Sequence, residues 1–445
     1  MFKFSDLQFI RKDSYVIGLT LFEEQIVRAL FLSDKFNLLK QLASQHSVII
    51  FTSHDIGHFL DFKISELRID NVKIFKIDTI KESFVVRIFS FCLKWSDPSS
   101  ATMKNLHRER INKRIGILGY WLRKFFFFCF SHSISFKRIF RQLLSLTYNL
   151  SNVKKASVLS LPNIDIFLAT ALTNSESDLP LAIYFKKQSI PVIATLRSWD
   201  NLVTKGTLRF EPSILLSHSR YMTDLATRVH GINPTSIVQS VTPAYQKQFL
   251  PNTNRSNGEN LKITYGCIGP VLNPDEINFI SWLADLSTQV EATITIVQHP
   301  KFSHDMNQIN SGKLVFKTFN YLSTTLHDYY DFIAQQNFVI ASGTTFALDT
   351  MFVRTQLIGL AFEIIEQDYW LSHLRSYDIQ PHSKFLFDEL SIKKVHSKLE
   401  LIELIKGNGV WQNHLNDEDS LQALTGDTSI KLDEQILNII NQGRF

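Results

Sequence analysis

The sequence predicts an α/β protein made of two doubly wound, Rossmann-like domains. Short apolar segments typical of buried parallel strands alternate with helical patterns along most of the 445 residues. Two of these segments end in polar turns rich in His, Ser, Gly and Thr, at residues 294–300 and 339–349. A polar stretch at residues 251–260 divides the alternation into two halves. Two such halves predict two domains that face each other across a cleft.

In the first half, short apolar runs bounded by polar residues predict the strands. In chain order they lie at residues 15–19, 48–51, 72–77, 157–159, 166–169, 191–196, 214–217 and 236–239. Longer segments with apolar residues three and four apart predict helices at residues 31–43, 179–188 and 220–229. A basic, aromatic helical region at about residues 104–150 interrupts the pattern. We therefore expect an N-terminal domain of residues 1–255 that carries a helical insertion.

The second half repeats the alternation after the polar stretch. Strands are predicted at residues 262–265, 293–297, 339–340 and 357–361, and helices at 280–286 and 326–334 and in the segment up to residue 445. The turn after residue 340 opens a further helix, whose apolar positions are Phe346, Leu348, Met351 and Phe352. These elements predict a C-terminal domain of residues 256–445.

Composition is that of a large soluble enzyme. The chain is too long for one ordinary core, and 44% hydrophobic residues suffice to bury more than one. Its three cysteines, Cys92, Cys129 and Cys267, have no metal-binding or redox spacing, so we expect reduced thiols. The N-terminus lacks the order of a signal peptide, and no run of about eighteen uncharged apolar residues occurs. We expect a cytoplasmic protein that does not span a membrane.

Positive charge is concentrated in one segment, residues 104–142. It holds ten Lys and Arg against the single acid Glu109, a local charge of +9, so the rest of the chain carries −4 of the net +5. Trp121 and many phenylalanines, including the run 125–128, are interleaved with these charges. Three interpretations follow: an interfacial helical region on anionic lipid, a buried helical insertion with a solvated face, or a nucleic-acid patch. We favour the membrane surface and expect no nucleic-acid partner.

The two polar turns predict an anion site. Because carboxyl ends of parallel strands meet at one sheet edge, His299 and the turn 342–345 should lie together. Free backbone N–H groups, hydroxyls and a helix N-terminus are what a phosphate needs, and an imidazole adds one more donor. The alternative is that Ser342 and Thr344 only cap the helix and that His299 is a structural turn histidine.

Several motifs of the second half resemble those of glycosyltransferases with the GT-B architecture. They are the segment 266–270 after a strand, His299-Pro300, and Ser342-Gly343-Thr344-Thr345 followed by Asp349. The His-Pro and Ser/Thr pair is similar to that of bacterial sialyltransferases, Kdo transferases and CDP-glycerol glycerophosphotransferases, where it holds a cytidine nucleotide's phosphates. The sialyltransferase Asp/Glu-Asp/Glu-Gly turn is missing, and Gln298 stands where Arg, Lys or Gly is usual.

Other motifs resemble bacterial surface-polysaccharide biosynthesis proteins. They are Ser198-Trp199-Asp200-Asn201 with Lys205-Gly206, the strand end Ala361-Phe362-Glu363, and the turn before Pro243. The resemblance covers about residues 158–399. It implies a nucleotide-sugar donor, with cytidine favoured and UDP as the alternative. It also places Glu363 where many GT-B enzymes hold a ribose or sugar hydroxyl.

The chemistry of the transfer assigns roles to these residues. No Asp-x-Asp stands in a plausible position, so we expect no metal and no cofactor, and His299, Ser342, Thr344 and Thr345, with Lys301 as a further charge, would neutralise the leaving phosphate. Asp200 is the candidate base for the acceptor hydroxyl, with Trp199 lowering the local polarity and Asn201 orienting it. The alternative is an Asp200 that caps its turn. His54, Asp55 and His58 are rival bases, and Asp349 is expected to hold the helix start.

The predicted function is a metal-independent glycosyltransferase that moves a sugar from a nucleotide donor to a surface glycan or lipid-linked acceptor. It would be cytoplasmic, peripheral at the inner face of the cytoplasmic membrane. Alternatives are a CDP-glycerol or ribitol-type glycerophosphotransferase, a sugar-nucleotide epimerase, and a non-catalytic partner of a polysaccharide assembly complex. The candidate catalytic residues are Asp200 and His299; the donor-binding residues are Gly266, Gly269, His299, Pro300, Ser342, Gly343, Thr344, Thr345 and Glu363; the acceptor-side residues are Ser198, Trp199, Asn201, Lys205, His54 and Asp55.

Overall fold

The structure is a computed structural model. It describes residues 14–32, 38–78, 82–148, 161–172, 178–251, 260–270, 273–305, 314–341, 345–372, 374, 381–384, 386, 392–407, 422, 425–443 and 445. Within these ranges no helix combines the length and the apolar character that crossing a bilayer requires.

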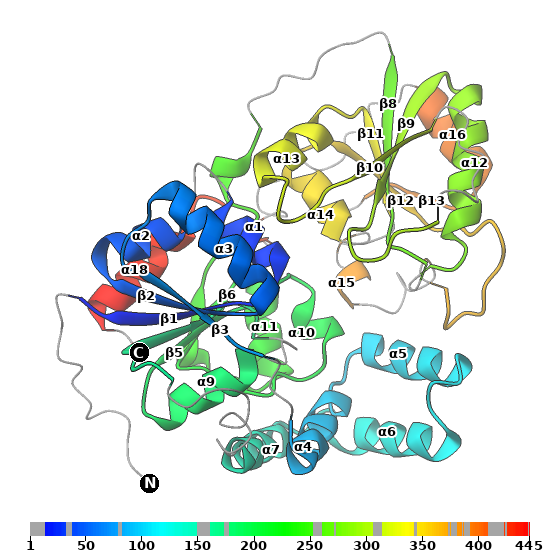
Figure 1. The fold of residues 1–445 in the computed structure, drawn as a ribbon. Coiled ribbons are helices and arrows are strands. Elements are labelled where there is room, and N and C mark those ends of the chain that lie inside the picture. Colours follow the sequence, from blue (N-terminus) through cyan, green and yellow to red (C-terminus); the bar gives the residue numbers. More distant parts are fainter. Residues whose placement is uncertain are drawn as a thin grey trace. The chain divides into compact units, whose positions relative to one another are not determined.

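The chain forms two compact units, and neither is one continuous stretch of sequence (Figure 1). The first unit comprises Met1–Asp97, His132–Gln246 and Thr425–Phe445. The second comprises Pro98–Ser131 and Lys247–Leu424. The chain therefore passes from one unit to the other at four points. The expected domains 1–255 and 256–445 divide the sequence once, whereas the units divide it by contact.

The first unit is built on a seven-stranded parallel sheet with strand order β3-β2-β1-β4-β5-β6-β7. The strands are β1 (Val16–Leu21), β2 (Ser47–Thr52), β3 (Val72–Lys76), β4 (Ile166–Ala169), β5 (Val192–Thr195), β6 (Ile214–Ser217) and β7 (Ile237–Gln239). Every residue of β4, β5 and β6 is buried, as expected for parallel strands with helices on both faces. The strand order reverses between β1 and β4.

Helices cover this sheet, and serine side chains cap the N-termini of four of them. They are α1 (Glu24–Phe31), α2 (Leu38–Gln45), α3 (His54–Leu67), α4 (Phe84–Trp95), α7 (Ile134–Thr147), α9 (Asp178–Lys187), α10 (Asn201–Thr204), α11 (Arg220–Arg228) and α18 (Leu432–Gln442), with a 3-10 turn at Pro234–Ser236. Ser53, Ser83, Ser133 and Ser219 cap α3, α4, α7 and α11. The C-terminal helix α18 packs against α2.

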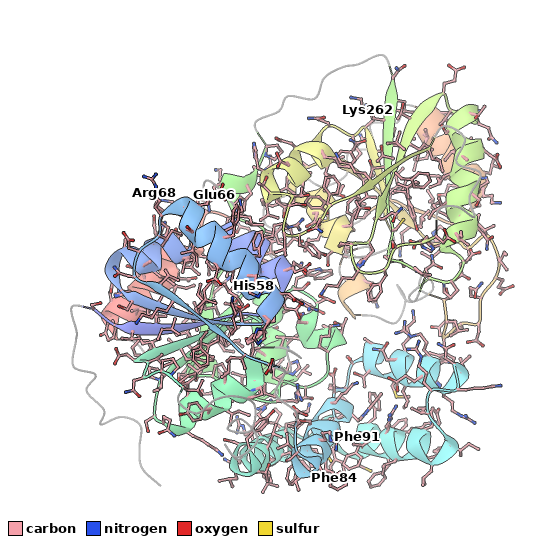
Figure 2. All side chains as sticks on the ribbon, viewed as in Figure 1. His58, Glu66, Arg68, Phe84, Phe91 and Lys262 are labelled. Carbon is pink, nitrogen blue, oxygen red and sulfur yellow. The ribbon has the colours of Figure 1, made fainter. Side chains whose placement is uncertain are left out.

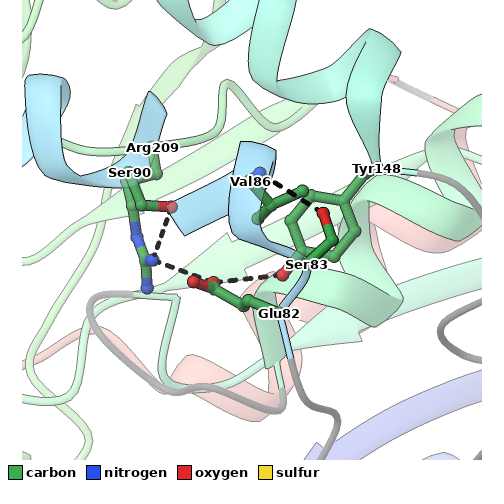
Figure 3. Close-up of polar contacts among 6 residues, drawn as sticks. All are labelled: Glu82, Ser83, Val86, Ser90, Tyr148 and Arg209. Atoms are coloured by element: carbon green, nitrogen blue, oxygen red, sulfur yellow. Dashed lines mark hydrogen bonds and ion pairs between the residues drawn. The ribbon is translucent and has the colours of Figure 1, made fainter. Parts of the chain in front are cut away.

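A polar cluster fixes the start of α4 (Figure 3). The Arg209 guanidinium binds the Glu82 carboxylate and the Ser90 hydroxyl, each at 3.1 Å, and the Tyr148 hydroxyl donates to the same carboxylate at 3.1 Å. Tyr148 is also the C-terminal cap residue of α7. The cluster therefore ties α4 and α7 to the loop after α10, although all three are far apart in sequence.

The second unit is built on a six-stranded parallel sheet with order β10-β9-β8-β11-β12-β13. Its strands are β8 (Leu261–Gly266), β9 (Ala292–Gln298), β10 (Leu314–Thr318), β11 (Phe338–Ala341), β12 (Gln356–Leu360) and β13 (Lys394–Val395). Its helices are α5 (Ser100–Ile111), α6 (Ile117–Phe130), α12 (Glu276–Gln289), α13 (Leu326–Ala334), α14 (Thr345–Phe352), α15 (Pro381–Lys384) and α16 (Lys398–Lys406), with a 3-10 turn at Lys247–Phe249. The order reverses between β8 and β11.

Both predicted doubly wound sheets are confirmed, and each has the strand order of a Rossmann-like fold. The expected strand at residues 157–159 lies outside the described residues. The single helix expected at residues 31–43 is wrong, because α1 ends at Phe31 and α2 begins at Leu38. The helix expected at 280–286 begins earlier, at Glu276, because that residue binds the preceding loop.

Candidate functional site

The candidate donor site lies at the carboxyl edge of the second sheet, where the strand order reverses. In open α/β sheets the loops after the two strands at this point separate and leave a crevice. Here those strands are β8, followed by Cys267 to Gly269, and β11, followed by the turn that opens α14. His299 follows β9 on one side, and Ala361 to Glu363 follow β12 on the other. The described donor candidates Gly266, Gly269, His299, Thr345 and Glu363 therefore lie at one sheet edge.

Two of the predicted donor glycines are required for packing. A Cβ on Gly266 would lie 2.2 Å from the Phe346 ring, so α14 approaches the end of β8 closely only because this residue is glycine. Gly269 has φ +91°, and its Cβ would lie 2.6 Å from the backbone oxygen of Phe302. Both glycines hold the loop after β8 against its neighbours; contact with a donor stays a prediction.

One buried carboxylate, that of Glu276 at the start of α12, organises this edge. Its Oε1 accepts from the Tyr265 hydroxyl and the Ile268 N–H, each at 2.8 Å, and its Oε2 accepts from the Gly269 N–H at 2.7 Å. The His304 Nε2 lies 2.6 Å from Oε2. Glu276 is fully buried. The carboxylate therefore fixes the loop after β8 and the turn after β9 to each other.

His299 presents a hydrogen-bond donor at this edge. Its Nδ1 accepts from the Lys301 backbone N–H at 3.1 Å, which places the ring proton of the neutral imidazole on Nε2. The ring stacks on Phe302, with centroids 5.0 Å apart. Burial, followed by the charge of Lys301, lowers the pKa of His299, and Glu276 offsets part of that shift. At neutral pH the side chain is therefore an uncharged N–H donor. Pro300 is exposed beside it.

The turn after β11 is only partly described. Ser342, Gly343 and Thr344 lie outside the described residues. Thr345, half-buried, is the first residue of α14. Asp349, expected to hold the helix start, instead lies inside α14, where its Oδ2 accepts from the Tyr329 hydroxyl of α13 at 2.6 Å. That contact ties two helices of the second unit.

The loop after β12 is tied to the same edge by Asp275. Its carboxylate accepts from the backbone N–H groups of Ile364 and Ile365, at 2.7 and 3.2 Å. The neighbouring Glu363 is half-buried, and its Oε2 accepts from the Gln367 N–H at 3.1 Å. Asp275 and Glu276 are consecutive, so the first turn of α12 holds the loops after three strands.

In the first unit, Asp200 follows β5 at the N-terminus of the short helix α10. Its Oδ2 accepts from the Thr204 hydroxyl at 2.9 Å. Burial lowers the pKa of Lys205, and the charge of Asp200 partly offsets this. The predicted neighbours Trp199 and Asn201 are only 2% and 0% exposed. Side chains so buried support the turn; they do not meet an acceptor without rearrangement.

The interior beside Asp200 holds unused polar atoms. Neither amide atom of Asn201 nor the Ser198 hydroxyl has a hydrogen-bond partner among the described residues. Arg197, just before them, pairs with Glu23 at 3.2 Å. Glu23 follows β1 and Arg197 follows β5, so this ion pair links the loops after two strands that have β4 between them.

The rival bases lie on another part of the first sheet. His54 Nε2 lies 3.2 Å from Asp78 Oδ1, and both side chains are more than half exposed. His58 Nδ1 lies 3.1 Å from Lys76 Nζ (Figure 2). Asp55 is exposed in the first turn of α3. These residues follow β2, which is three strand spacings from β5, about 14 Å. They and Asp200 therefore do not share one reacting centre.

Within the described residues, no group of three or more His, Cys, Asp or Glu is placed to hold a metal ion. Sequence reasoning missed Glu276, His304 and Tyr265. The only signal was an acidic pair at the start of a helix after a glycine-containing loop. Such a pair usually complements the helix dipole, so its role as a loop anchor was not predictable without the fold.

The sequence matches no protein-family model and no curated protein. Among solved structures, a Listeria monocytogenes protein assigned as a UDP-N-acetylglucosamine 2-epimerase has a TM-score of 0.51 at 11% identity, covering 97% of this chain and 96% of that one. UDP-GlcNAc 2-epimerase from Methanocaldococcus jannaschii has a TM-score of 0.50 at 12% identity, covering 97% and 100%. At these identities the similarity shows the fold alone, the GT-B-like combination of two α/β domains.

Proposed function

We propose that this protein is a metal-independent glycosyltransferase that moves a sugar from a nucleotide-activated donor to a surface glycan or lipid-linked acceptor. One observation carries the proposal: His299, on the loop after β9 beside the reversal point of the second sheet, holds an N–H donor on Nε2. A neutral donor fixed by its neighbours stabilises the charge that develops on a leaving phosphate without reorganising. Thr345 stands at the N-terminus of α14 on the adjacent loop.

The acceptor hydroxyl requires a base, and we assign that role to Asp200. The Thr204 hydroxyl donates to Asp200 Oδ2 at 2.9 Å and so orients the carboxylate. In this mechanism the acceptor oxygen attacks the anomeric carbon, Asp200 takes its proton, and the nucleotide leaves with its charge held at the second sheet. We expect the protein to act at the inner face of the cytoplasmic membrane.

The nucleotide is expected to be a cytidine nucleotide, on the strength of the His-Pro and Ser/Thr motifs. UDP is the alternative to test, because the Methanocaldococcus epimerase was solved with UDP-GlcNAc and UDP. A sugar-nucleotide epimerase is the second candidate function, since it has the same fold. An epimerase would require carboxylates close to the turn before α14. The carboxylate of α14, Asp349, is instead bound by the Tyr329 hydroxyl, which argues against that activity.

Two measurements test this function. Thermal shift with CMP, CDP, UDP and GDP identifies the nucleotide, and binding of none of them would remove the transferase and the epimerase together. With the preferred nucleotide sugar, proton NMR then separates the activities. Release of nucleotide that depends on an added acceptor supports the transferase, whereas inversion at a sugar carbon without acceptor identifies the epimerase. CDP-glycerol in the same assay tests the glycerophosphotransferase.

A further inference from the structure

The structure divides the basic segment 104–142 among three helices, α5, α6 and α7, which lie in different environments. In α7, Lys137 Nζ donates to the Val229 oxygen at 2.6 Å, and Arg141 donates to the oxygens of His230 and, at 2.7 Å, Leu208. These carbonyls include those just past the end of α11, where a helix favours cations. Lys137 and Arg141 are buried. The two charges therefore stabilise the first unit and are not displayed to a partner.

Helices α5 and α6 form a hairpin that belongs to the second unit. Its first helix is held firmly: Lys104 Nζ donates to the Ser372 oxygen at 2.5 Å, and His107 stacks on Trp370 with centroids 4.0 Å apart. Burial, then the charge of Arg108, lowers the pKa of Lys104 to about 7, with a partial offset from Glu363. Lys104 is therefore also an internal residue.

The second helix of the hairpin, α6, is tied to α5. Arg123 pairs with Glu109 of α5, and the Tyr120 hydroxyl lies 3.5 Å from His107 Nδ1. None of the side chains of α6 is buried. A helix rich in Phe, Leu and Trp thus has one face toward α5 and the rest exposed.

The exposed face of α6 is a continuous apolar stripe. Leu118 is 83% exposed, Trp121 58% and Phe128 65%. Residues three and four apart lie on one helix face. The stripe, which we call the α6 stripe, consists of Leu118, Trp121, Leu122, Phe125 and Phe128. Exposed apolar surface of this extent marks an interaction site.

Cations surround the stripe. Arg110, Lys113 and Arg114 stand at the tip of the hairpin, and none of them takes part in an ion pair among the described residues. Lys124 lies over the rings of Trp121 and Phe128, at 5.0 and 5.8 Å from the centroids. The segment 98–131 holds a single acid, Glu109, which Arg123 occupies. A partner that matches this surface therefore has an apolar interior for the α6 stripe and negative charge at its surface for the surrounding cations.

We propose that the α5–α6 hairpin docks on an anionic bilayer, with the α6 stripe in the acyl boundary and Arg110, Lys113 and Arg114 among the headgroups. An α6 of 14 residues is about 21 Å long, shorter than the roughly 30 Å hydrocarbon core, so it lies in the interface and does not span it. Tryptophan is favoured at this depth. Docking of this kind does not require the transferase activity, so vesicle binding and turnover fail independently.

Vesicle sedimentation tests the proposal with matched variants. Wild type should bind phosphatidylcholine vesicles containing phosphatidylglycerol at low salt and be released at high salt. Leu118→Ser with Trp121→Ser should weaken binding roughly tenfold or more, because two exposed anchors are lost. Phe84→Ser with Leu146→Ser, equally exposed on α4 and α7 (Figure 2 labels Phe84), is the control and should bind as wild type.

The α6 variant should fold, because it changes no buried side chain, and an unchanged melting temperature verifies this. If it binds as wild type while the α4–α7 control loses binding, the bilayer surface lies on the first unit and the proposal is wrong. If wild type does not bind the vesicles at low salt, the stripe does not dock on a bilayer and the proposal is also wrong.

A second measurement reports depth. Brominated lipid quenches tryptophan fluorescence only from within the bilayer, so bound wild type should be quenched. Trp121→Phe keeps an aromatic anchor and should bind, but its quenching should largely disappear. Equal quenching of both proteins would show that Trp121 stays outside the bilayer, which overturns the assigned geometry.

Discussion

The carboxyl edges of the two sheets have the same strand order but are held by different chemistry. In the first unit hydrogen bonds between neutral groups stand beside the Arg197–Glu23 ion pair: the Thr195 hydroxyl bonds His218 Nε2 at 2.9 Å, and the Thr170 hydroxyl donates to the Thr20 oxygen at 2.6 Å. In the second unit one buried carboxylate, Glu276, accepts from the loops themselves. The shared strand order therefore determines where the loops leave each sheet. It does not determine which interactions hold the loops or how those interactions depend on pH.

The largest expected difference between the units appears in acid. Burial lowers the pKa of His218 and of His230 to about 3, against about 6.5 in an unfolded chain. Above pH 6.5 neither state binds the proton and stability is complete; as pH falls toward 3, only the unfolded state binds it. At pH 4.5 each histidine should therefore lower the free energy of unfolding by about 2.7 kcal/mol, and the two together by about 5 kcal/mol.

Hydrogen exchange followed by mass spectrometry, corrected for intrinsic rates, measures this unit by unit. Between pH 7 and pH 4.5, peptides from β5 and β6 should lose protection before peptides from β8 and β9. Loss of protection in β8 and β9 before β5 and β6 would show that the first unit is the more stable one in acid, which contradicts this prediction.

The next effect concerns the charged edge. Glu276→Ala removes the acceptor for two backbone N–H groups, a hydroxyl and His304, and should destabilise the second unit by about 3 to 5 kcal/mol. Urea unfolding measures the loss. Glu403→Ala, an exposed residue of α16, is the control and should stay within about 0.5 kcal/mol. Similar midpoints for both variants would mean that the carboxylate does not hold this edge.

If the edge of the first sheet holds the base and the edge of the second sheet binds the donor, a variant of the first should change turnover and a variant of the second should change donor affinity. Asp200→Asn keeps the side-chain shape and removes the base, so turnover should fall by roughly a hundredfold or more while donor affinity changes by less than about 0.5 kcal/mol. Asp224→Asn on α11 is a matched surface control. Near-full turnover of Asp200→Asn would assign the role of base to His54, Asp55 or His58. Loss of donor binding in this variant would instead indicate that Asp200 has a structural role.

The smallest effect is expected at His299. His299→Ala removes a donor to a charged phosphate and should weaken nucleotide binding by about 1.5 to 3 kcal/mol. Calorimetry with the nucleotide chosen by thermal shift measures it, and His327→Ala, a partly exposed histidine of α13, serves as control. An affinity equal to that of the control variant would leave the second edge without its assigned donor.

The sequence was sufficient for most strands and for their order along the chain, but β10 and β13 were not predicted. Buried parallel strands such as β5 and β11 read as continuous apolar runs, and short βα connections restrict the sheet to few topologies. The same reasoning predicts that His299 and the turn at 342–345 share one edge, and for residues 342–344, which lie outside the described residues, this stays a prediction. Local pattern therefore predicts which loops gather at the edge of a sheet.

Long-range partners were not predictable. In α7, Lys137 binds a carbonyl 92 residues away, whereas in α6 Lys124 lies over rings of its own helix. Both helices carry the same mixture of cations and aromatics, so composition alone assigns both to one surface. Only the fold shows which cations are bound by groups inside the protein. The role of Glu276 was not predicted for the same reason, since its partner His304 comes from another loop.

The repeated passage of the chain between the units has a practical consequence for engineering. A fragment that stops at Gln246 carries Lys104 and His107 without Ser372 and Trp370, and it lacks the segment whose Gly426 packs against the His218 oxygen. The first unit also loses Gln435, which accepts from Ser240 at 2.6 Å. Chimeras that exchange the second unit must therefore transplant residues 98–131 together with 247–424, and leave the last twenty-one residues with the first unit.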